Sequence, residues 1–426
     1  MAPSNVRCRK FSAIDVWMTL AAIASALLLL FAAAESQAQT FTVLHSFTRA
    51  NGVPNQPYNG LAITPGGILY GTTLRGGTYE NGTAFELKRA GSGWLLNVLH
   101  NFQGGTDGAM PVATVTIGPG GVLYGTTSEG GDPNCGTNGG CGTVYSLQPP
   151  AHAPFSALTS WTEKVLYAFH GGSDGRTPGY GAPAFDPNGN MYGTTEFGGD
   201  VQDCSDGCGT VYELSPTISG GWTEQILHRF DGSYYEGAVP VGGIILDGVG
   251  DLYGFTTLFH QVFFTLQPQW QYYFVDQLLN DTGCDVSSSL LLDPNTFNFY
   301  GVAQGCGSGG EYGGGSVFDW FYGFSLVHDF GTTRGNYVTP EGPLIKDAGG
   351  NLYGVSFNGG AHQSGAVYKL TPMPGGWSYT GLYDFTGGDD GSGPVGNLVM
   401  DAAGNLYGVT AYGGPYSGGV VFEITP

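Results

Sequence analysis

A Tyr-Gly pair recurs at seven anchor positions along this chain, and the repeat restricts the possible folds more than any other feature. Each pair lies in a short apolar run followed by small residues, and the anchor tyrosines are Tyr70, Tyr124, Tyr192, Tyr253, Tyr300, Tyr353 and Tyr407. Consecutive anchors are 47 to 68 residues apart, which is too long for a solenoid that adds one strand per repeat. The interval has room for several short strands, so the repeat predicts a series of small sheets.

Four strand-like runs can be read around the first anchor. They are Gly60–Thr64, Ile68–Thr73, Thr83–Leu87 and Trp94–Phe102, and glycine-rich turn signals separate them. The chain contains 76 glycines in 426 residues, yet 13% of its residues are aromatic. That aromatic content is too high for a chain that stays unfolded. We therefore expect a turn-dense, all-β protein with four strands in each repeat.

The two ends of the repeat array are complementary. Phe41–Phe47 matches fourth strands such as Asn97–Phe102, whereas Val420–Thr425 reads as a third strand with no fourth strand after it. Adding the first strand to the last unit completes seven groups of four. This arrangement predicts a seven-bladed β-propeller of four-stranded blades, whose ring is closed by the N-terminal strand pairing with the last blade. A linear array of sheets is the alternative, and it would leave unpaired edges at both ends.

The tandem motifs also resemble a known family. The pattern Leu/Ile-Leu-Tyr-Gly-Thr-Thr, Gly-Gly, Gly-Thr-Val-Tyr and Gly-Gly-Trp is similar to that of the GloVer tandem-repeat family of secreted bacterial proteins, most closely at Leu69–Gly77, Leu123–Gly131 and Met191–Gly199. The resemblance covers essentially the whole chain after residue 38, and it implies a propeller fold and export but no catalytic residue. The chain departs from the pattern at Phe255–Phe263, where the Gly-Gly loop is missing, and in the unit around Tyr300.

The N-terminal segment is typical of a secretory signal peptide. Three basic residues precede an apolar stretch from Val16 to Ala34, and small residues follow at Ser36 and Ala38. We expect a signal peptide over residues 1–38 and a single propeller domain over residues 39–426, located outside the cell or in the periplasm. A retained membrane anchor is the alternative, because the apolar stretch is long enough to span a bilayer. After cleavage we expect no membrane insertion.

The charge of the chain excludes one class of partner. Without residues 1–38 the chain has 13 − 3 = 10 Lys and Arg against 34 − 2 = 32 Asp and Glu, a balance of 22 negative charges. This field repels nucleic acid and disfavours acidic polysaccharides. We therefore expect a neutral glycan or a protein as partner.

Six of the seven cysteines follow the predicted signal peptide, and an even number in an exported chain favours disulfides. Proximity in the sequence suggests the pairs Cys135–Cys141, Cys204–Cys208 and Cys284–Cys306. A zinc site at Cys204 and Cys208 is the alternative, which an oxidising compartment disfavours.

Residues that return in every unit are more readily explained as scaffold than as a binding site. A Trp precedes the end of the fourth strand by eight positions in five units, and these packing residues are Trp94, Trp161, Trp222, Trp270 and Trp377. One position two residues before the strand-ending Phe carries the hydrogen-bonding residues His45, His100, His228 and His328. The turns between first and second strands contain Asp186, Asp293, Asp347 and Asp401, which we interpret as turn formers.

Candidate binding residues lie on one face of the predicted ring. Because consecutive strands are antiparallel, the loops from second to third strand and the loops between blades emerge on the same face, which we call the loop-rich face. The candidate ligand-binding residues in these loops are Asp107, Asp174, Asp390, Arg49, Arg75, Arg176, Arg334 and Glu129. Asp107, Asp174 and Asp390 each precede a Gly and read as turn residues, with weak Ca²⁺ binding as the alternative. We expect no other cofactor.

The sequence contains no nucleophile elbow, zinc-protease motif or phosphate-binding loop. The first interpretation is a monomeric binding module for a neutral glycan or a protein partner, which acts through the loop-rich face. The second is a glycoside hydrolase or polysaccharide lyase with its site at the mouth of the central channel, where Arg176, His260 and His362 are the candidate catalytic residues. The third is a structural component of a surface assembly.

Overall fold

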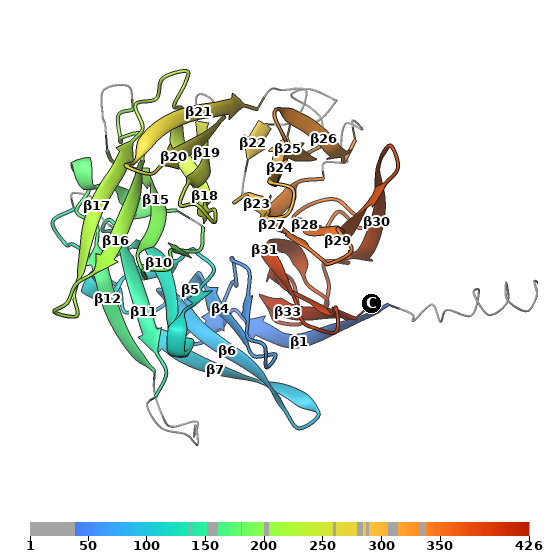
Figure 1. Cartoon of the computed structure of the whole chain (residues 1–426). Coiled ribbons are helices and arrows are strands. Elements are labelled where there is room, and N and C mark those ends of the chain that lie inside the picture. The colour runs from blue at the N-terminus through green and yellow to red at the C-terminus, as the bar shows by residue number, and fades with distance from the viewer. Residues whose placement is uncertain are drawn as a thin grey trace, which may run out of the picture. The chain divides into compact units, whose positions relative to one another are not determined.

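Seven antiparallel sheets follow one another along the chain and form the blades of a ring in the computed structural model (Figure 1). The structure describes residues 39–135, 139–150, 161–179, 181–199, 204–258, 261–278, 284–286, 289–305, 314–331 and 338–425. Residues Phe41–Thr425 make up one compact unit. The seven-bladed, four-stranded propeller expected from the repeat is therefore confirmed.

Blades 1 to 3 have similar strands. Blade 1 contains β3 (Ala62–Ile63), β4 (Leu69–Thr73), β6 (Thr83–Ala90) and β7 (Gly93–Asn101). Blade 2 contains β8 (Ala109–Pro111) and β9 (Thr116–Ile117) in the first position, then β10 (Leu123–Glu129), β11 (Thr143–Gln148) and β12 (Thr162–Ala168). Blade 3 contains β13 (Arg176–Pro178) and β14 (Ala184–Phe185), then β15 (Met191–Phe197), β16 (Thr210–Pro216) and β17 (Trp222–Arg229).

Blades 4 to 6 continue the ring. Blade 4 contains β18 (Ala238–Leu246), β19 (Leu252–Leu258), β20 (Val262–Gln267) and β21 (Gln271–Gln277). Blade 5 contains β22 (Cys284–Val286) and β23 (Leu291–Asp293), then β24 (Asn298–Gly305), β25 (Ser316–Trp320) and β26 (Phe324–Asp329). Blade 6 contains β27 (Pro340–Lys346), β28 (Leu352–Ser356), β29 (Ala366–Met373) and β30 (Gly376–Asp384).

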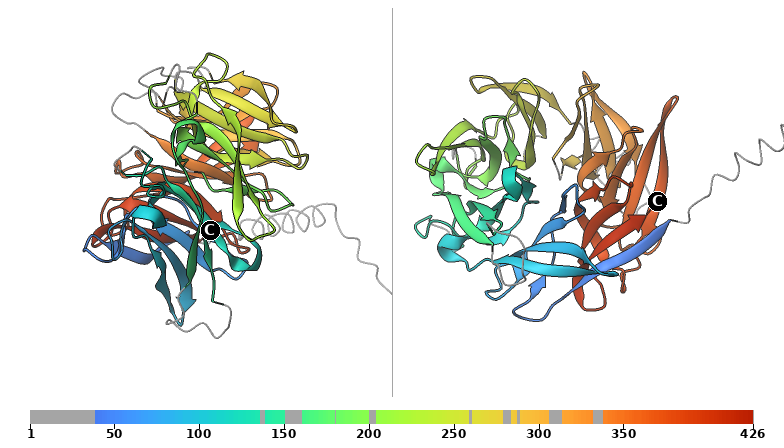
Figure 2. Two further views of the ribbon diagram at one scale, coloured as in Figure 1. Left: turned by 90° about the vertical axis from the view of Figure 1, so that its left-hand side faces the viewer. Right: turned by 60° about the horizontal axis from the view of Figure 1, so that its bottom comes forward.

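Blade 7 joins the two ends of the ring. It contains β31 (Ser392–Met400), β32 (Leu406–Tyr412) and β33 (Ser417–Thr425), and its fourth strand is β1 (Thr40–Thr48) in the order β1-β33-β32-β31. Figure 2 shows β1 in blue beside the red strands of the last blade. The N-terminal strand therefore closes the ring as the complementary ends predicted.

A few short elements lie outside the regular blade positions. Strand β2 (Pro54–Asn55) pairs with β5 (Arg75–Gly76), and the 3-10 turns are η1 (Gly105–Asp107), η2 (Pro119–Gly121) and η3 (Gly172–Asp174). Among the described residues, no helix has the length and apolar character that a membrane crossing requires.

Each residue of the repeated Tyr-Gly pair makes its own packing contact. The Gly leaves room for an aromatic ring of the third strand, since a Cβ on Gly125 would lie 2.5 Å from the Tyr145 hydroxyl. The Tyr lies against the Trp of the next blade, as in Tyr70 with Trp161 at 5.8 Å between ring centroids. The same contact is made by Trp94 with Tyr407, Tyr192 with Trp270 and Tyr300 with Trp377. The repeated Trp residues therefore pack between blades.

A second aromatic contact completes most seams between blades. The Phe that ends a fourth strand meets the third-strand aromatic ring of the next blade edge to face, as in Phe102 with Tyr145 at 5.0 Å and Phe169 with Tyr212 at 5.1 Å. Such edge-to-face pairs contribute beyond their buried area. The periodic sequence thus places its largest side chains where two blades meet.

Two of the predicted disulfides are present. Cys135 is bonded to Cys141 and Cys204 to Cys208, so the pairing expected from their proximity is confirmed. The third predicted pair lies outside the described residues, because Cys306 is not among them.

Candidate functional site

The first strand of several blades begins in the same strained way at the loop-rich face. Gln56, Met110, Thr177 and Val239 each precede a Pro and each have a φ of 55° or 56°, a left-handed value that non-glycine residues rarely adopt. The Thr177 N–H donates to the Cys141 carbonyl at 2.9 Å, and the Val239 N–H donates to the Cys208 carbonyl at 2.8 Å. Since the geometry recurs from blade to blade, we interpret it as a clasp that holds neighbouring blades together around the channel.

A cavity of about 550 Å³ lies on the axis of the ring. Residues from the first position of all seven blades line it, among them Tyr58, Thr114, Ala182, Val241, Ser289, Glu341 and Asn397. The backbone is tightly packed here, because a Cβ on Gly181 would lie 1.9 Å from the Gly243 Cα. Its volume is within the usual range of small-molecule sites.

Glu341 departs from the repeat at the wall of this cavity. It directly follows the Pro that begins a first strand, a position that Tyr58, Val112, Gly179, Val241 and Val395 occupy in other blades. Its carboxylate Oε2 accepts a hydrogen bond from Gln304 Nε2 of the preceding blade. Burial raises the pKa of Glu341 to about 7.

Two residues of blade 1 share the cavity with Glu341. Burial, and secondarily the charge of Glu341, raises the pKa of the Tyr58 phenol, so the two groups lie within electrostatic reach. Asn59 is 7% exposed, and its Nδ2 has no hydrogen-bond partner among the described residues. A buried amide donor without a partner is costly unless a ligand or a water accepts from it.

The remaining polar lining is hydrogen-bonded and uncharged. Thr114 Oγ1 donates to Asn397 Oδ1 at 3.1 Å, and Asn397 Nδ2 donates to the Leu61 carbonyl at 3.0 Å. Ser289 Oγ accepts from the Gly243 N–H. The cavity thus offers a fixed set of amide and hydroxyl groups around a single carboxyl group among its described lining residues.

Two aromatic residues share an apolar cluster with Tyr58, which lines the cavity. Phe357 and Tyr412 meet edge to face at 6.2 Å, and both pack in the same apolar cluster as Tyr58. The guanidinium of Arg49, a predicted ligand residue, lies 5.7 Å from the centre of the Tyr412 ring. Arg49 is therefore the predicted residue that the structure connects to this side of the channel.

The three predicted Asp residues of the inter-blade loops close their own turns. Asp107 accepts from the Gln103 N–H at 2.6 Å, Asp174 from the His170 N–H at 2.7 Å and Asp390 from the Thr386 N–H at 2.8 Å. Each also interacts with the preceding fourth strand, through His100, Tyr167 and Tyr383 respectively. Within the described ranges, no three His, Cys, Asp or Glu side chains are grouped so that they could hold a metal ion.

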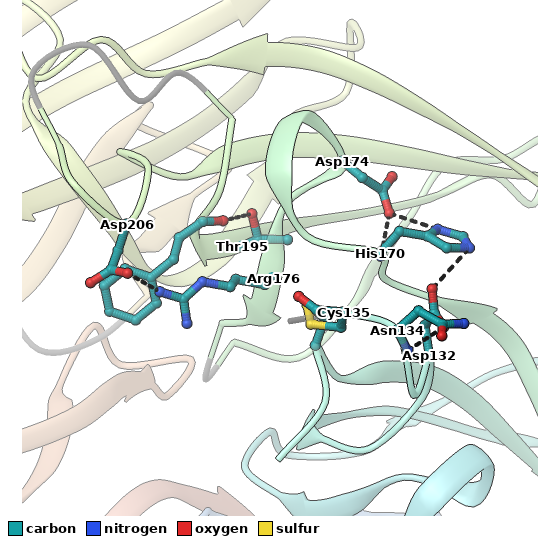
Figure 3. The surroundings of a disulfide bond; sticks show 10 residues. Asp132, Asn134, Cys135, His170, Asp174, Arg176, Thr195 and Asp206 are labelled. Carbon is teal, nitrogen blue, oxygen red and sulfur yellow. Dashed lines mark hydrogen bonds and ion pairs between the residues drawn. A yellow bond between two sulfur atoms is a disulfide. The ribbon is translucent and has the colours of Figure 1, made fainter. Parts of the chain in front are cut away.

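Arg176 lies in a separate group on the same face, shown in Figure 3. Its Nη2 is 2.9 Å from Asp206 Oδ1, and its guanidinium lies 4.7 Å from the centre of the Phe197 ring. Burial raises the pKa of the neighbouring Glu196 to about 7, although the charge of Arg176 opposes the shift. Glu196 Oε1 is buried and has no partner among the described residues.

The other predicted residues are not brought together. Arg75 is exposed in the short strand β5, His362 is exposed on a loop of blade 6, and Glu129 is half-buried at the end of β10. His260 and Arg334 lie outside the described residues. Their suggested roles in binding or catalysis remain predictions.

Several residues at the face were not predicted from the sequence. His170 lies between two carboxylates, with Nδ1 3.1 Å from Asp174 Oδ2 and Nε2 3.9 Å from Asp132 Oδ2 (Figure 3). Tyr58, Asn59 and Glu341 were not predicted either. A signal for them exists, because a Pro lies in or shortly before the first strand of six blades, at Pro57, Pro111, Pro178, Pro240, Pro340 and Pro394. Aligning the chain on these prolines shows a charged residue after only one of them.

Comparison with known proteins gives a family match and distant structural similarities. A family model of the Gloeobacter/Verrucomicrobia repeat matches residues 30–261 and 259–426. No curated protein sequence matches the chain. A proposed 6-phosphogluconolactonase from Bacteroides fragilis is similar in structure at 13% identity and a TM-score of 0.48, over 83% of this chain and 87% of the other. A proposed oxidoreductase (glucose dehydrogenase) from Thermus thermophilus is similar at 13% identity and a TM-score of 0.44, over 91% and 99% of the two chains.

Proposed function

This chain belongs to the Gloeobacter/Verrucomicrobia repeat family, and from that premise we propose that it is an exported binding module that holds a neutral glycan at the channel mouth. The two disulfides fit an oxidising compartment, and the predicted signal peptide provides a route to it. The repeat explains most side chains as scaffold. The cavity brings together polar groups from different blades, among them Asn59 and Glu341.

The observation that carries the proposal is the unpartnered Asn59 Nδ2, among the described residues, in a cavity of about 550 Å³. Amide and hydroxyl groups at fixed positions suit the many hydroxyl groups of a sugar, and the Tyr58 ring supplies an apolar surface against which a sugar ring can pack. The net negative charge of 21 for the whole chain disfavours a polyanionic ligand.

A glycan array probed with the full-length protein tests the proposal, followed by calorimetry on the glycans that bind. Asn59→Ala should weaken binding by roughly tenfold, because it removes a buried donor that only the ligand satisfies. The melting temperature should not fall, since Asn59 Nδ2 makes no hydrogen bond within the described structure. Asn97→Ala is the control, because Asn97 is half-buried on β7 and bonds to Glu86 away from the channel.

Equal binding by wild type and Asn59→Ala would rule out the channel as the site. Absence of binding to every glycan would overturn the proposal, and large homo-oligomers in that case would favour the structural role. Binding of a protein partner is tested by a pull-down of a defined candidate protein with the wild type and with Asn59→Ala.

One observation favours the enzymatic alternative. A carboxyl group whose pKa is about 7 has the property required of a general acid at neutral pH, and Glu341 has it. A glycosidase also needs a second carboxylate across the substrate. An assay for reducing ends on every glycan that binds separates the two functions, because a binding module releases none.

A further inference from the structure

Glu341 is the member of the channel wall that the repeat does not explain. The corresponding positions are uncharged in the other described blades, and Tyr58 and Val241 are examples. A scaffold role would return in other blades, as the Trp and anchor Tyr residues do. A carboxyl group at this one position therefore calls for a reason outside the packing of the ring.

No cation of the described chain neutralises this carboxyl group. Glu341 takes part in no ion pair among the described residues, and the described lining of the cavity includes no Lys, Arg or His. Arg49 is exposed, and its guanidinium lies 5.7 Å from the centre of the Tyr412 ring. A carboxylate shielded from water is costly unless a positive charge or several hydrogen bonds accompany it, and among the described residues only Gln304 donates to the half-buried Glu341.

The groups around Glu341 match the needs of a primary ammonium group. An ammonium group donates three hydrogen bonds and accepts none. The Glu341 carboxylate can accept such a hydrogen bond, and the Tyr58 side chain lines the same cavity. The aromatic ring of Tyr58 in the same lining favours a cation electrostatically. Asn59 Nδ2 remains as a donor for a hydroxyl or carbonyl oxygen of the same ligand.

We propose that the channel mouth selects a sugar unit that carries a free primary amine within an otherwise neutral glycan, and that Glu341 binds this amine as its counter-ion. This inference rests on the proposed function and specifies its ligand class. Desolvation of Glu341 disfavours the empty, ionised site, and a bound ammonium group removes that penalty. The selectivity therefore comes from a charge that the protein leaves uncompensated.

The experiment compares matched pairs of glycans. Each glycan that binds on the array is tested as its amine form and its N-acetylated form, with glucosamine and N-acetylglucosamine oligomers included as probes in every case. The amine form should bind at least about tenfold more tightly than its acetylated partner at pH 7.5. Glu341→Gln should abolish the preference and keep the weaker binding of the acetylated form. Glu163→Gln is the matched control, because the pKa of Glu163 is also raised to about 7 and its side chain lies between blades 1 and 2.

The outcomes separate this inference from the proposed function. Equal affinity for both forms, or a preference that survives in Glu341→Gln, overturns the inference and leaves glycan binding intact. Absence of binding by both forms of every glycan overturns both. Unfolding of Glu341→Gln would be detected by its melting temperature, and the pH dependence of the wild type then decides.

That pH dependence has a defined sign. Ionised Glu341 is needed to bind the ammonium group, so affinity for the amine form should fall by roughly tenfold for each pH unit below 7. The Tyr58 phenol stays protonated in this range, because its pKa is raised above 10.0. Calorimetry in buffers of different ionisation enthalpy should detect proton release on binding at pH 6. Affinity that does not change between pH 5 and 8 contradicts the inference.

Discussion

The seam between blades 2 and 3 and the seam between blades 4 and 5 occupy equivalent places in the ring and are built differently. In the first, Phe169 packs on Tyr212 at 5.1 Å, and the buried Cys141 of a disulfide-bonded loop lies in the same cluster. In the second, Leu278 takes the place of the strand-ending Phe, and a cluster that includes Phe255 and Phe263 fills the seam.

The difference shows two ways to stabilise the same interface. The seam between blades 2 and 3, which we call the regular seam, combines the aromatic pairs Phe169–Tyr212 and Tyr124–Phe185 with a disulfide and with the clasp from Thr177 to the Cys141 carbonyl. The seam between blades 4 and 5, which we call the aromatic seam, includes the stretch Phe255–Phe263, where the Gly-Gly loop of the repeat is missing. The ring centre of Phe263 lies within 5.4 Å of the ring centres of Phe255, Phe299 and Trp320. We infer that, in this part of the ring, the burial of apolar side chains stabilises the seam in place of a disulfide-bonded loop.

The largest effect is expected from Phe263→Ala. The side chain is fully buried, and its removal should lower the free energy of unfolding by about 3–5 kcal/mol. Phe169→Ala in the regular seam is the comparison and should cost less, because Phe169 has fewer aromatic neighbours. Chemical denaturation of both variants measures the difference. A greater loss in Phe169→Ala would contradict the distinction between the seams.

Removing the disulfide of the regular seam should have the next largest effect. The double variant Cys135→Ala and Cys141→Ala should lose roughly 2 kcal/mol, because the short loop between the cysteines gains freedom in the unfolded chain. Reduction of the wild type should lower its melting temperature in the same direction. No change on reduction would show that the clasp and the aromatic pairs suffice to stabilise this seam.

Leu278→Phe places in the aromatic seam the Phe that ends the fourth strand in the other blades. Leu278 is 4% exposed beside Phe318 and Val286, so the larger ring should overpack the cluster and cost roughly 1–2 kcal/mol. The reverse change in the regular seam, Phe169→Leu, provides the control for the side-chain exchange itself. A stabilised Leu278→Phe protein would mean that the aromatic seam has room for the repeat residue.

The smallest effect concerns pH. Glu224 lies next to Asp174 in the regular seam, and burial, with a secondary contribution from Asp174, raises its pKa to about 7 from an ordinary value of 4.5. Phe324 occupies the matching position in the aromatic seam. Since the folded protein holds the Glu224 proton more tightly than the unfolded chain, this group should lower stability as the pH rises from about 4.5 to about 7.

Glu224→Gln should therefore reduce the loss of melting temperature between pH 5 and 8. Glu163 has an equally raised pKa in the seam between blades 1 and 2, so the double variant with Glu163→Gln should reduce it further. A melting temperature whose pH dependence is the same in wild type and double variant would show that these carboxyl groups do not titrate with folding.

Local patterns in the sequence predicted the turns and the repeated hydrogen-bonding positions of the blades. The turn role of Asp186 is confirmed, because its Oδ1 accepts from the N–H groups of Asn188 and Asn190. These contacts lie within a few residues, so a repeat in the sequence is enough to indicate them. The side chains of His100 and His228 likewise make hydrogen bonds at their shared position.

The channel site could not be found in the same way. Tyr58 and Glu341 are almost 300 residues apart, and they meet only because the ring closes. The first strands are also short and interrupted in several blades, so their alternation of polar and apolar residues is weak. Which side chains face the axis depends on bulges such as the register shift between Glu341 and Ile345, which strand periodicity does not indicate.

The pairing of β1 with β33 has a consequence for how the molecule comes into being. Blade 7 needs the earliest and the latest residues of the ring, so it cannot be completed on a partly synthesised chain. Until Ser417–Thr425 is available, β1 has no partner and the growing stack of blades ends in open edges. Completion of the ring is therefore a non-local step that follows synthesis of the last blade, and a truncated product would expose edge strands that aggregate.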